Sequence, residues 1–100
     1  MVVTDNLNVE FLTRLWKIDK SGLTARDLML LYTIMTHPGI SGLEAANLVG
    51  VRARSSVQFS YARLMKREMI EDRRVQESKG VPNRLFILPA GLEFWNQMKF

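Results

Sequence analysis

Two helix-start signals separated by a glycine turn constrain the fold of this chain more than any other feature. The stretch SGLE begins at Ser41 and the stretch SSVQ begins at Ser55, and in each a serine precedes Glu or Gln by three residues. Such capping boxes satisfy the unpaired N–H groups at the start of a helix. Gly50 lies between them, where glycine favours the end of a helix. The pattern predicts two short helices and a tight turn, a helix-turn-helix over residues 41–67.

The flanking segments complete the expected order of elements. TARD is another helix start, with Thr24 as its N-cap, and the HPG that follows ends that helix because proline disfavours helical backbone in the residue before it. Behind the helix-turn-helix, two β-type runs on either side of ESKGVPN predict a hairpin. The expected elements are helices over 6–18, 25–36 and 90–99, the helix-turn-helix, and a wing hairpin over 70–88. This is a mainly α fold with a small β-hairpin, a winged helix-turn-helix in the order α-α-α-α-β-β-α.

Length and composition set the outer limits. A chain of 100 residues with 47% hydrophobic residues is expected to form one domain over residues 1–100. It has no cysteine, which excludes a disulfide framework and a thiolate metal site and fits a reducing cytoplasm. The N-terminal MVVTDNLN lacks the basic and apolar regions of a signal peptide, and no apolar run approaches the ~20 residues of a membrane span. We therefore expect a cytoplasmic protein without a membrane partner.

Positive charge concentrates in the second half of the chain. Residues 1–50 hold four Lys and Arg against five Asp and Glu, whereas residues 51–100 hold ten against five. The helix opened by SSVQ has an apolar stripe on one face and hydroxyl and basic groups on the opposite face. The stripe consists of Val57, Tyr61, Leu64 and Met65. A helix seated on a core, with a basic outer face, fits a major groove about 12 Å wide and predicts a recognition helix over 55–67. The alternative is a basic face that is merely solvated.

The expected DNA contacts come from this helix and from the wing. Near the helix they are Arg52, Arg54, Ser55, Ser56, Gln58, Phe59, Arg63 and Lys66, and in the wing they are Arg73, Arg74, Lys79 and Arg84. Cations on the helix would bind phosphates or guanine edges, and wing cations would reach the minor groove or its flanking phosphates. Two alternatives stay open. The wing arginines can pair with Glu71, Asp72 or Glu77 instead, and Ser55 can simply cap the helix.

Phe59 is a separate case, because an aromatic ring on the polar face of a helix is unfavourable unless something covers it. Two interpretations are equally open. The ring touches a thymine methyl group in the major groove, or it packs on the first helix of the helix-turn-helix.

The same region resembles the winged helix-turn-helix of MarR-like regulators. The resemblance covers roughly residues 40–95 and rests on LVGVRARSSVQFSYARLMKREMIEDRR and RLFILPAGLEFW. Matching positions are Gly50, Val51, Arg54, Ser55, Ser56, Val57, Arg63, Leu64, Ile70, Leu88 and Gly91. The turn VRARSS is one residue longer than usual, Glu68 stands where the family often has glycine, and Pro89 replaces a threonine. The resemblance implies a winged-helix fold and DNA-binding transcriptional regulation, but it does not indicate a small-molecule effector.

The terminal helices indicate a protein partner. In the first helix, one apolar stripe is formed by Leu7, Phe11, Leu15 and Ile18, and an opposed stripe is formed by Val9, Leu12 and Trp16. A helix that is apolar all round is expected to be buried all round, which a domain of 100 residues cannot easily achieve alone. We expect a homodimer whose interface includes Val9, Leu12, Trp16, Phe94, Trp95 and Met98. The alternative is that these helices complete a monomeric core.

The sequence carries no catalytic pattern. His37 is the only histidine and precedes a proline in a turn, and no phosphate-binding loop or nucleophile motif occurs. We therefore expect no enzyme activity, no cofactor and no metal site. The leading hypothesis is sequence-specific binding of double-stranded DNA by a homodimeric transcriptional regulator, a repressor. The alternatives are a winged-helix protein-interaction module, or DNA binding for plasmid partition, replication or chromatin architecture.

Overall fold

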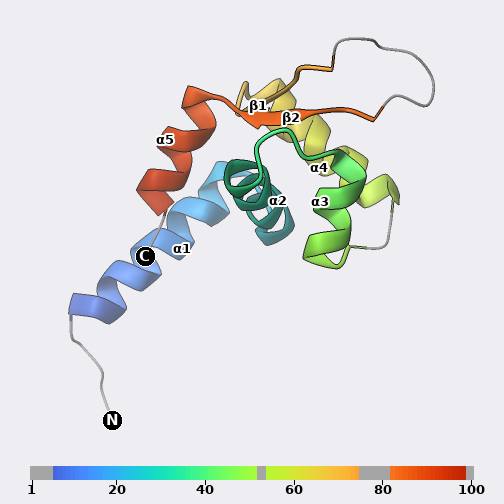
Figure 1. Ribbon diagram of the computed structural model, residues 1–100. Coiled ribbons are helices and arrows are strands. Elements are labelled where there is room, and N and C mark those ends of the chain that lie inside the picture. Colours follow the sequence, from blue (N-terminus) through green and yellow to red (C-terminus); the bar gives the residue numbers. More distant parts are fainter. Residues whose placement is uncertain (1–5, 52–53, 75–81, 99–100) are drawn as a thin grey trace.

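The computed structural model of the protein describes residues 6–51, 54–74 and 82–98. Within these ranges five helices and a two-stranded hairpin follow in the predicted order (Figure 1). The elements are α1 (Asn6–Ser21), α2 (Ala25–Thr36), α3 (Gly42–Val49), α4 (Arg54–Lys66), β1 (Ile70–Asp72), β2 (Leu85–Ile87) and α5 (Pro89–Met98). The structure thereby confirms the winged helix-turn-helix class.

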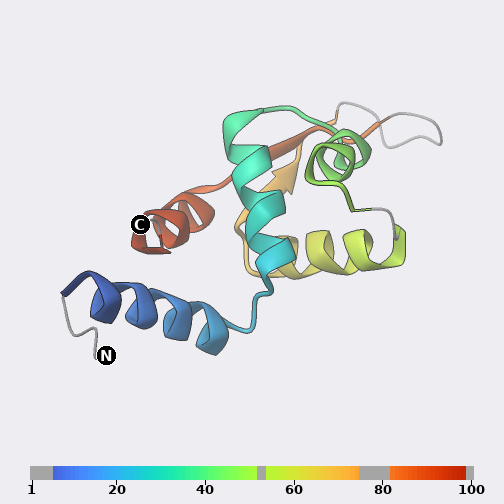
Figure 2. The same cartoon turned by 90° about the horizontal axis from the view of Figure 1, so that it is seen from below.

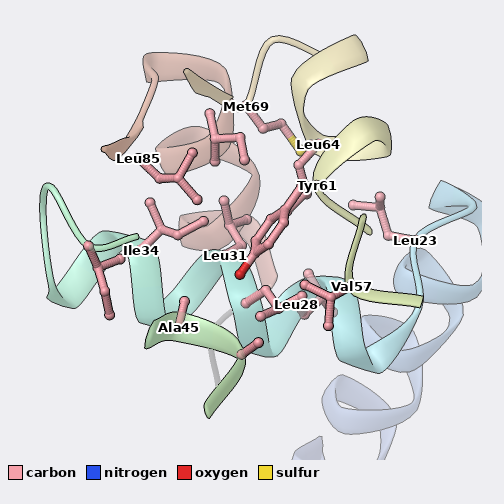
Figure 3. Close-up of a cluster of buried hydrophobic side chains, with 14 residues drawn as sticks. Leu23, Leu28, Leu31, Ile34, Ala45, Val57, Tyr61, Leu64, Met69 and Leu85 are labelled. Carbon is pink, nitrogen blue, oxygen red and sulfur yellow. The ribbon is translucent and has the colours of Figure 1, made fainter. Parts of the chain in front are cut away.

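Helix α2 lies at the centre and packs on α3, α4, β2 and α5. Its side chains Leu30, Leu31 and Ile34 have no solvent exposure. Figure 3 shows side chains from α3, α4 and β2 gathered around it, among them Ala45, Tyr61, Leu64 and Leu85. Each fully buried aliphatic side chain of this size stabilises a fold by about 1.5–3 kcal/mol. The core therefore fixes how α4 is presented to the outside.

The predicted helix starts of α2 and α3 are confirmed. Thr24 and Asp27 form a complete capping box, with the Asp27 N–H donating to Thr24 Oγ1 at 3.1 Å and the Thr24 N–H donating to Asp27 Oδ2 at 3.0 Å. Ser41 Oγ accepts the N–H of Glu44 at 3.1 Å and donates to the Glu44 carboxylate at 3.2 Å. Replacing such N-caps by alanine typically costs about 1 kcal/mol.

The predicted capping box of Ser55 with Gln58 is wrong. Helix α4 already begins at Arg54, so Ser55 lies inside its first turn and cannot be the residue that precedes the helix. Helix α3 ends in a tight turn just before α4. Gly50 has φ +86°, and the Val51 N–H donates to the Ala46 carbonyl at 3.0 Å, which reverses the chain within two residues.

Helix α4 ends in the same kind of turn, but without a glycine. The Met69 N–H donates to the Leu64 carbonyl at 3.0 Å and the Glu68 N–H donates to the Met65 carbonyl at 2.9 Å. The residue in the left-handed conformation is Glu68, with φ +57°. A side chain in this conformation costs about 1–2 kcal/mol relative to a right-handed residue. Glu68 therefore holds a strained position at the junction of α4 and the wing.

Helix α5 follows β2 directly and lies in close contact with the backbone just before β1. Strands β1 and β2 are antiparallel, with Ile70 opposite Ile87, and Leu88 donates its N–H to the Met69 carbonyl at 2.8 Å. A Cβ atom on Gly91 would lie 2.4 Å from that same carbonyl oxygen. Glycine is thus required where α5 crosses the end of α4. Pro89 is the first residue of α5, a position where proline is favoured because no helical N–H is lost.

Helix α1 extends away from the rest of the protein, as Figures 1 and 2 show. It packs on α5, and Ile18 contacts the core. The side chain of Leu7 lies outside those that the structure describes. The other residues of both predicted stripes are exposed, with Phe11 and Leu15 on one side and Val9, Leu12 and Trp16 on the other. Among the described residues, no helix is long and apolar enough to cross a membrane.

Candidate nucleic-acid interface

Helix α4 divides into an inward and an outward face, largely as predicted. Val57, Tyr61 and Leu64 are buried, whereas Met65 is exposed, so its predicted place in the buried stripe is wrong. We call the opposite strip the outward face of α4. It consists of Ser55, Phe59, Ala62 and Lys66, all of which are exposed. Gln58 is exposed beside this strip, and Ser56 is half-buried at its other side.

Phe59 does not pack on α3, the first helix of the motif. Its side chain is 65% exposed, and it borders an open hollow between α4 and the start of α2. The hollow is lined by Thr24, Ala25, Arg26, Ser56, Phe59, Ser60 and Arg63. Of the two interpretations of Phe59, the one that covers the ring within the chain is therefore wrong, because the ring faces outward.

Arg63, a predicted DNA contact, is engaged inside the protein. Its Nε donates to Asp27 Oδ2 and its Nη2 to Asp27 Oδ1, both at 2.9 Å. The Asp27 side chain has no solvent exposure, whereas the Arg63 side chain is 39% exposed. The pair therefore ties the start of α2 to the middle of α4. A bidentate pair of this kind fixes orientation as well as charge.

The environment of Asp27 explains why the carboxylate stays charged. Burial alone would raise the pKa of Asp27, but hydrogen bonds from Arg63, Ser60 and Thr24 outweigh it and lower the pKa to about 2. Ser60 is itself fully buried beside the pair. The pairing of Asp27 with Arg63 was not predicted from the sequence. The signal was available, since Asp27 shares the face of α2 that carries Leu31 and Ile34, where an acid needs a cation.

A second set of hydrogen bonds joins α3, α4 and the wing at one residue, Gly42. The Gly42 N–H donates to Asn83 Oδ1 at 2.7 Å, and the Gly42 carbonyl accepts from the Tyr61 hydroxyl at 2.6 Å. Burial raises the pKa of Tyr61 to about 12, so this hydroxyl remains a donor. Neither Asn83 nor this role of Tyr61 was predicted. The contacts hold the base of the wing against the helix-turn-helix.

The wing arginines follow the alternative of local ion pairing. Arg73 pairs with Glu71, and its guanidinium lies 4.7 Å from the centre of the Phe86 ring. Arg74 pairs with Asp72 at 3.0 Å. Arg84 is exposed and leans over Gly39. Among the other predicted contacts, Arg52, Lys79 and the side chain of Arg54 lie outside the described residues.

Arg67 is a basic residue that was not among the predicted contacts. It is exposed directly after α4, and its Nη1 donates to the carbonyl of Ser21, the last residue of α1. Arg63 within α4 and Arg67 just after it thus each bind a neighbouring element of the same chain. Among the side chains that the structure describes, Lys66 is the cation on the outward face of α4.

The predicted dimer residues fall into two groups. Val9, Leu12 and Trp16 on α1 are exposed, whereas Met98 on α5 is buried. Phe94 packs on the core. Trp95 is half-buried, with its ring centre 5.1 Å from that of Tyr32 and the planes tilted by 44°. Met98 is thus not available on the surface, because the inward face of α5 closes the core of the same chain. The exposed apolar residue of α5 is Leu92.

No family model matches the sequence, and no curated protein matches it. Solved structures do. The PcaV transcriptional regulator of Streptomyces coelicolor has 20% identity and a TM-score of 0.68, over 78% of this chain and 56% of PcaV. The MarR of E. coli without ligand has 10% identity and a TM-score of 0.69, over 98% of this chain and 76% of that one. The multiple antibiotic-resistance repressor of Listeria monocytogenes has 20% identity and a TM-score of 0.63, over 98% and 74%.

These similarities show the fold. The chain has a winged helix-turn-helix fold like that of MarR-like transcriptional regulators, which confirms the predicted resemblance at the level of structure. It spans between about half and three quarters of the length of these structures, with 56% for PcaV. None of these three is named as an enzyme.

Proposed function

We propose that this protein binds double-stranded DNA with sequence preference, with α4 in the major groove and the wing at the minor groove. The observation that carries the proposal is the division of α4. Its inward face is seated in the core, and its outward face exposes Ser55, Phe59 and Lys66. Hydroxyl groups and cations bond phosphates, and exposed side chains on a seated helix read base edges. The likeness in fold to transcriptional regulators supports this assignment.

We further propose that the protein acts as a homodimeric transcriptional repressor. Both sides of α1 expose large apolar side chains, with Leu15 at 43% on one side and Trp16 at 57% on the other. A second copy that covers these residues would remove apolar surface from water on both chains. Two copies related by a two-fold axis would present two α4 helices to a pseudo-palindromic site. Occupation of such a site would then block transcription.

The first test is fluorescence anisotropy with the DNA upstream of the protein's own gene and with a scrambled duplex, at about 50 and 200 mM salt. We expect tight binding to the upstream DNA at both salt concentrations. Binding to the scrambled duplex should be lost at the higher one. Equal and steeply salt-sensitive binding to both would favour an architectural role or a distant target. Absence of binding at low salt would overturn the proposal in favour of a protein-interaction module.

The dimer is tested separately by sedimentation at micromolar concentration. Trp16→Glu places a charge on the exposed apolar side of α1 and is expected to yield monomers. Lys17→Glu is the matched control, because Lys17 is an exposed cation next to Trp16 on the same helix. A wild type that is already monomeric at tens of micromolar would refute the homodimer.

A further inference from the structure

Phe59 is an exposed aromatic ring in the middle of the outward face of α4. Its side chain is 65% exposed, as much as any large apolar side chain of the described residues. Ser55 precedes it by one helical turn and Ala62 follows it by nearly one turn, so the three share one strip. At one side of the ring lies the open hollow that contains Arg26. Within the described part of the chain, most of the surface of Phe59 is therefore open to water.

The neighbours of the ring restrict what can cover it. Ser55 and Gln58 are exposed beside Phe59, Arg26 lines the hollow that the ring borders, and Lys66 is exposed two turns further along the same strip, so the ring is an apolar spot on a polar and basic surface. The centre of a protein–protein interface is usually depleted of charged residues, which does not fit this setting. The partner must instead offer one apolar group within a polar, negatively charged surface. The major groove meets this requirement, because the thymine C5-methyl group lies among polar base edges and between two rows of phosphates.

We propose that Phe59 contacts the C5-methyl group of thymine and is a specificity-determining residue of the DNA-binding helix. The inference rests on the proposed function and adds the base that the helix selects. Ala62 favours this contact because its small side chain leaves the Phe59 ring accessible along the next turn of α4. Arg63 contributes by position, because its bond to Asp27 holds the α4 turn that carries the ring.

The experiment begins with selection of preferred sites from a random duplex pool by the full chain. Each thymine of the selected site is then replaced by uracil, which lacks only the C5-methyl group and keeps base pairing. Fluorescence anisotropy gives the affinity of the wild type and of Phe59→Ala for each duplex. We expect at least one uracil substitution to weaken wild-type binding roughly four-fold, the effect of one buried methyl-sized group. Phe59→Ala is expected to bind the thymine and uracil duplexes equally.

The matched control is Leu48→Ala on α3, because Leu48 is 62% exposed but lies outside α4. This variant is expected to keep the wild-type response to uracil. If no uracil substitution weakens wild-type binding, or if Phe59→Ala responds to uracil as the wild type does, the thymine assignment is overturned while the selected site still supports DNA binding. In the second case the ring serves another partner, such as a protein. If the chain binds no duplex at all, the proposed function fails and this inference fails with it.

Discussion

Arg63 of α4 donates two hydrogen bonds of 2.9 Å to the carboxylate of Asp27, which is fully buried at the start of α2. The two partners differ in their access to water, since Arg63 keeps 39% of its side chain exposed. This asymmetry governs what happens when either partner is removed. A charge left unpaired in the interior is costly, whereas a charge left unpaired near the surface can be hydrated.

The two single substitutions should therefore differ in stability. Arg63→Ala leaves the Asp27 carboxylate buried without its cation and is expected to cost about 3 kcal/mol in unfolding free energy. Asp27→Asn leaves a half-exposed guanidinium and is expected to cost about 1–2 kcal/mol. Urea unfolding measures both. Lys66→Ala on the same helix is the control and should stay within about 0.5 kcal/mol of the wild type. Equal losses for the two variants would contradict the asymmetry.

The same pair predicts a pH dependence. The pKa of Asp27 is lowered to about 2 in the folded protein, whereas an unfolded aspartate titrates near 3.9, so the unfolded state binds the proton first as pH falls. The contribution of the carboxylate, roughly 2 kcal/mol, is complete above about pH 4 and is lost as pH falls through about 2. The unfolding free-energy difference between wild type and Asp27→Asn should be constant from about pH 7 to 5 and shrink at lower pH. A difference that stays constant down to about pH 2.5 would rule out the lowered pKa.

If the proposed DNA binding is correct, Lys66 and Arg63 should affect it differently. Lys66 is exposed on the outward face of α4, so Lys66→Ala should reduce the slope of log Kd against log salt by about one. Arg63→Gln should lower the affinity with little change in that slope, because its guanidinium is engaged by Asp27 and positions the helix. Circular dichroism at each salt concentration shows whether both variants are folded. A slope reduced equally by Arg63→Gln would make Arg63 a phosphate contact, as the sequence analysis proposed.

Replacement of Glu68 by glycine should raise the stability of the fold. Because Glu68 has φ +57°, Glu68→Gly relieves an unfavourable backbone conformation and is expected to stabilise the fold by about 0.5–1 kcal/mol after the entropy of glycine in the unfolded chain is counted. Glu93→Gly is the matched control, since Glu93 lies exposed within α5, where glycine should destabilise by about 1 kcal/mol. Thermal unfolding should move the two variants in opposite directions. A shared direction would show that the turn after α4 is not strained.

Gly91 and Gly50 should respond differently to alanine. A Cβ on Gly91 would meet the Met69 carbonyl at 2.4 Å, whereas a Cβ on Gly50 would meet no atom within 4 Å and would suffer only from φ +86°. We expect Gly91→Ala to cost about 2–3 kcal/mol and Gly50→Ala about 1 kcal/mol. Urea unfolding measures the loss of unfolding free energy in each variant. The reverse ranking would mean that α5 shifts away from the hairpin without penalty.

The fold was predictable because its signals are local. Thr24, Ser41 and Gly50 act on the backbone within a few residues of themselves, so caps and turns could be inferred without knowledge of the tertiary structure. The start of α4 was misplaced because a serine signals a helix start only to within a residue or two. Glu68 shows the other limit. The resemblance marked a glycine position there, but only the backbone angle reveals that Glu68 adopts the glycine-like conformation.

The candidate site was predictable only in outline, because a helical wheel gives faces and not partners. It correctly separated the inward residue Leu64 from the outward residue Lys66. It could not show that Arg63 reaches an aspartate far away in the sequence, or that Met98 closes the core of its own chain. Both errors arise from tertiary contacts: periodicity can mark Asp27 as an acid on a buried face that needs a cation, but it does not say which cation reaches it.

The two backbone hydrogen bonds of Gly42 have a further consequence for how this fold moves. Its N–H is held by Asn83 at the base of the wing and its carbonyl by Tyr61 of α4. Any displacement of the wing from α3 must release the first of these bonds and expose that amide to solvent. The rate at which the Gly42 amide proton exchanges with deuterium therefore reports how often the wing detaches. A ligand that clamps the wing would slow the exchange of this proton.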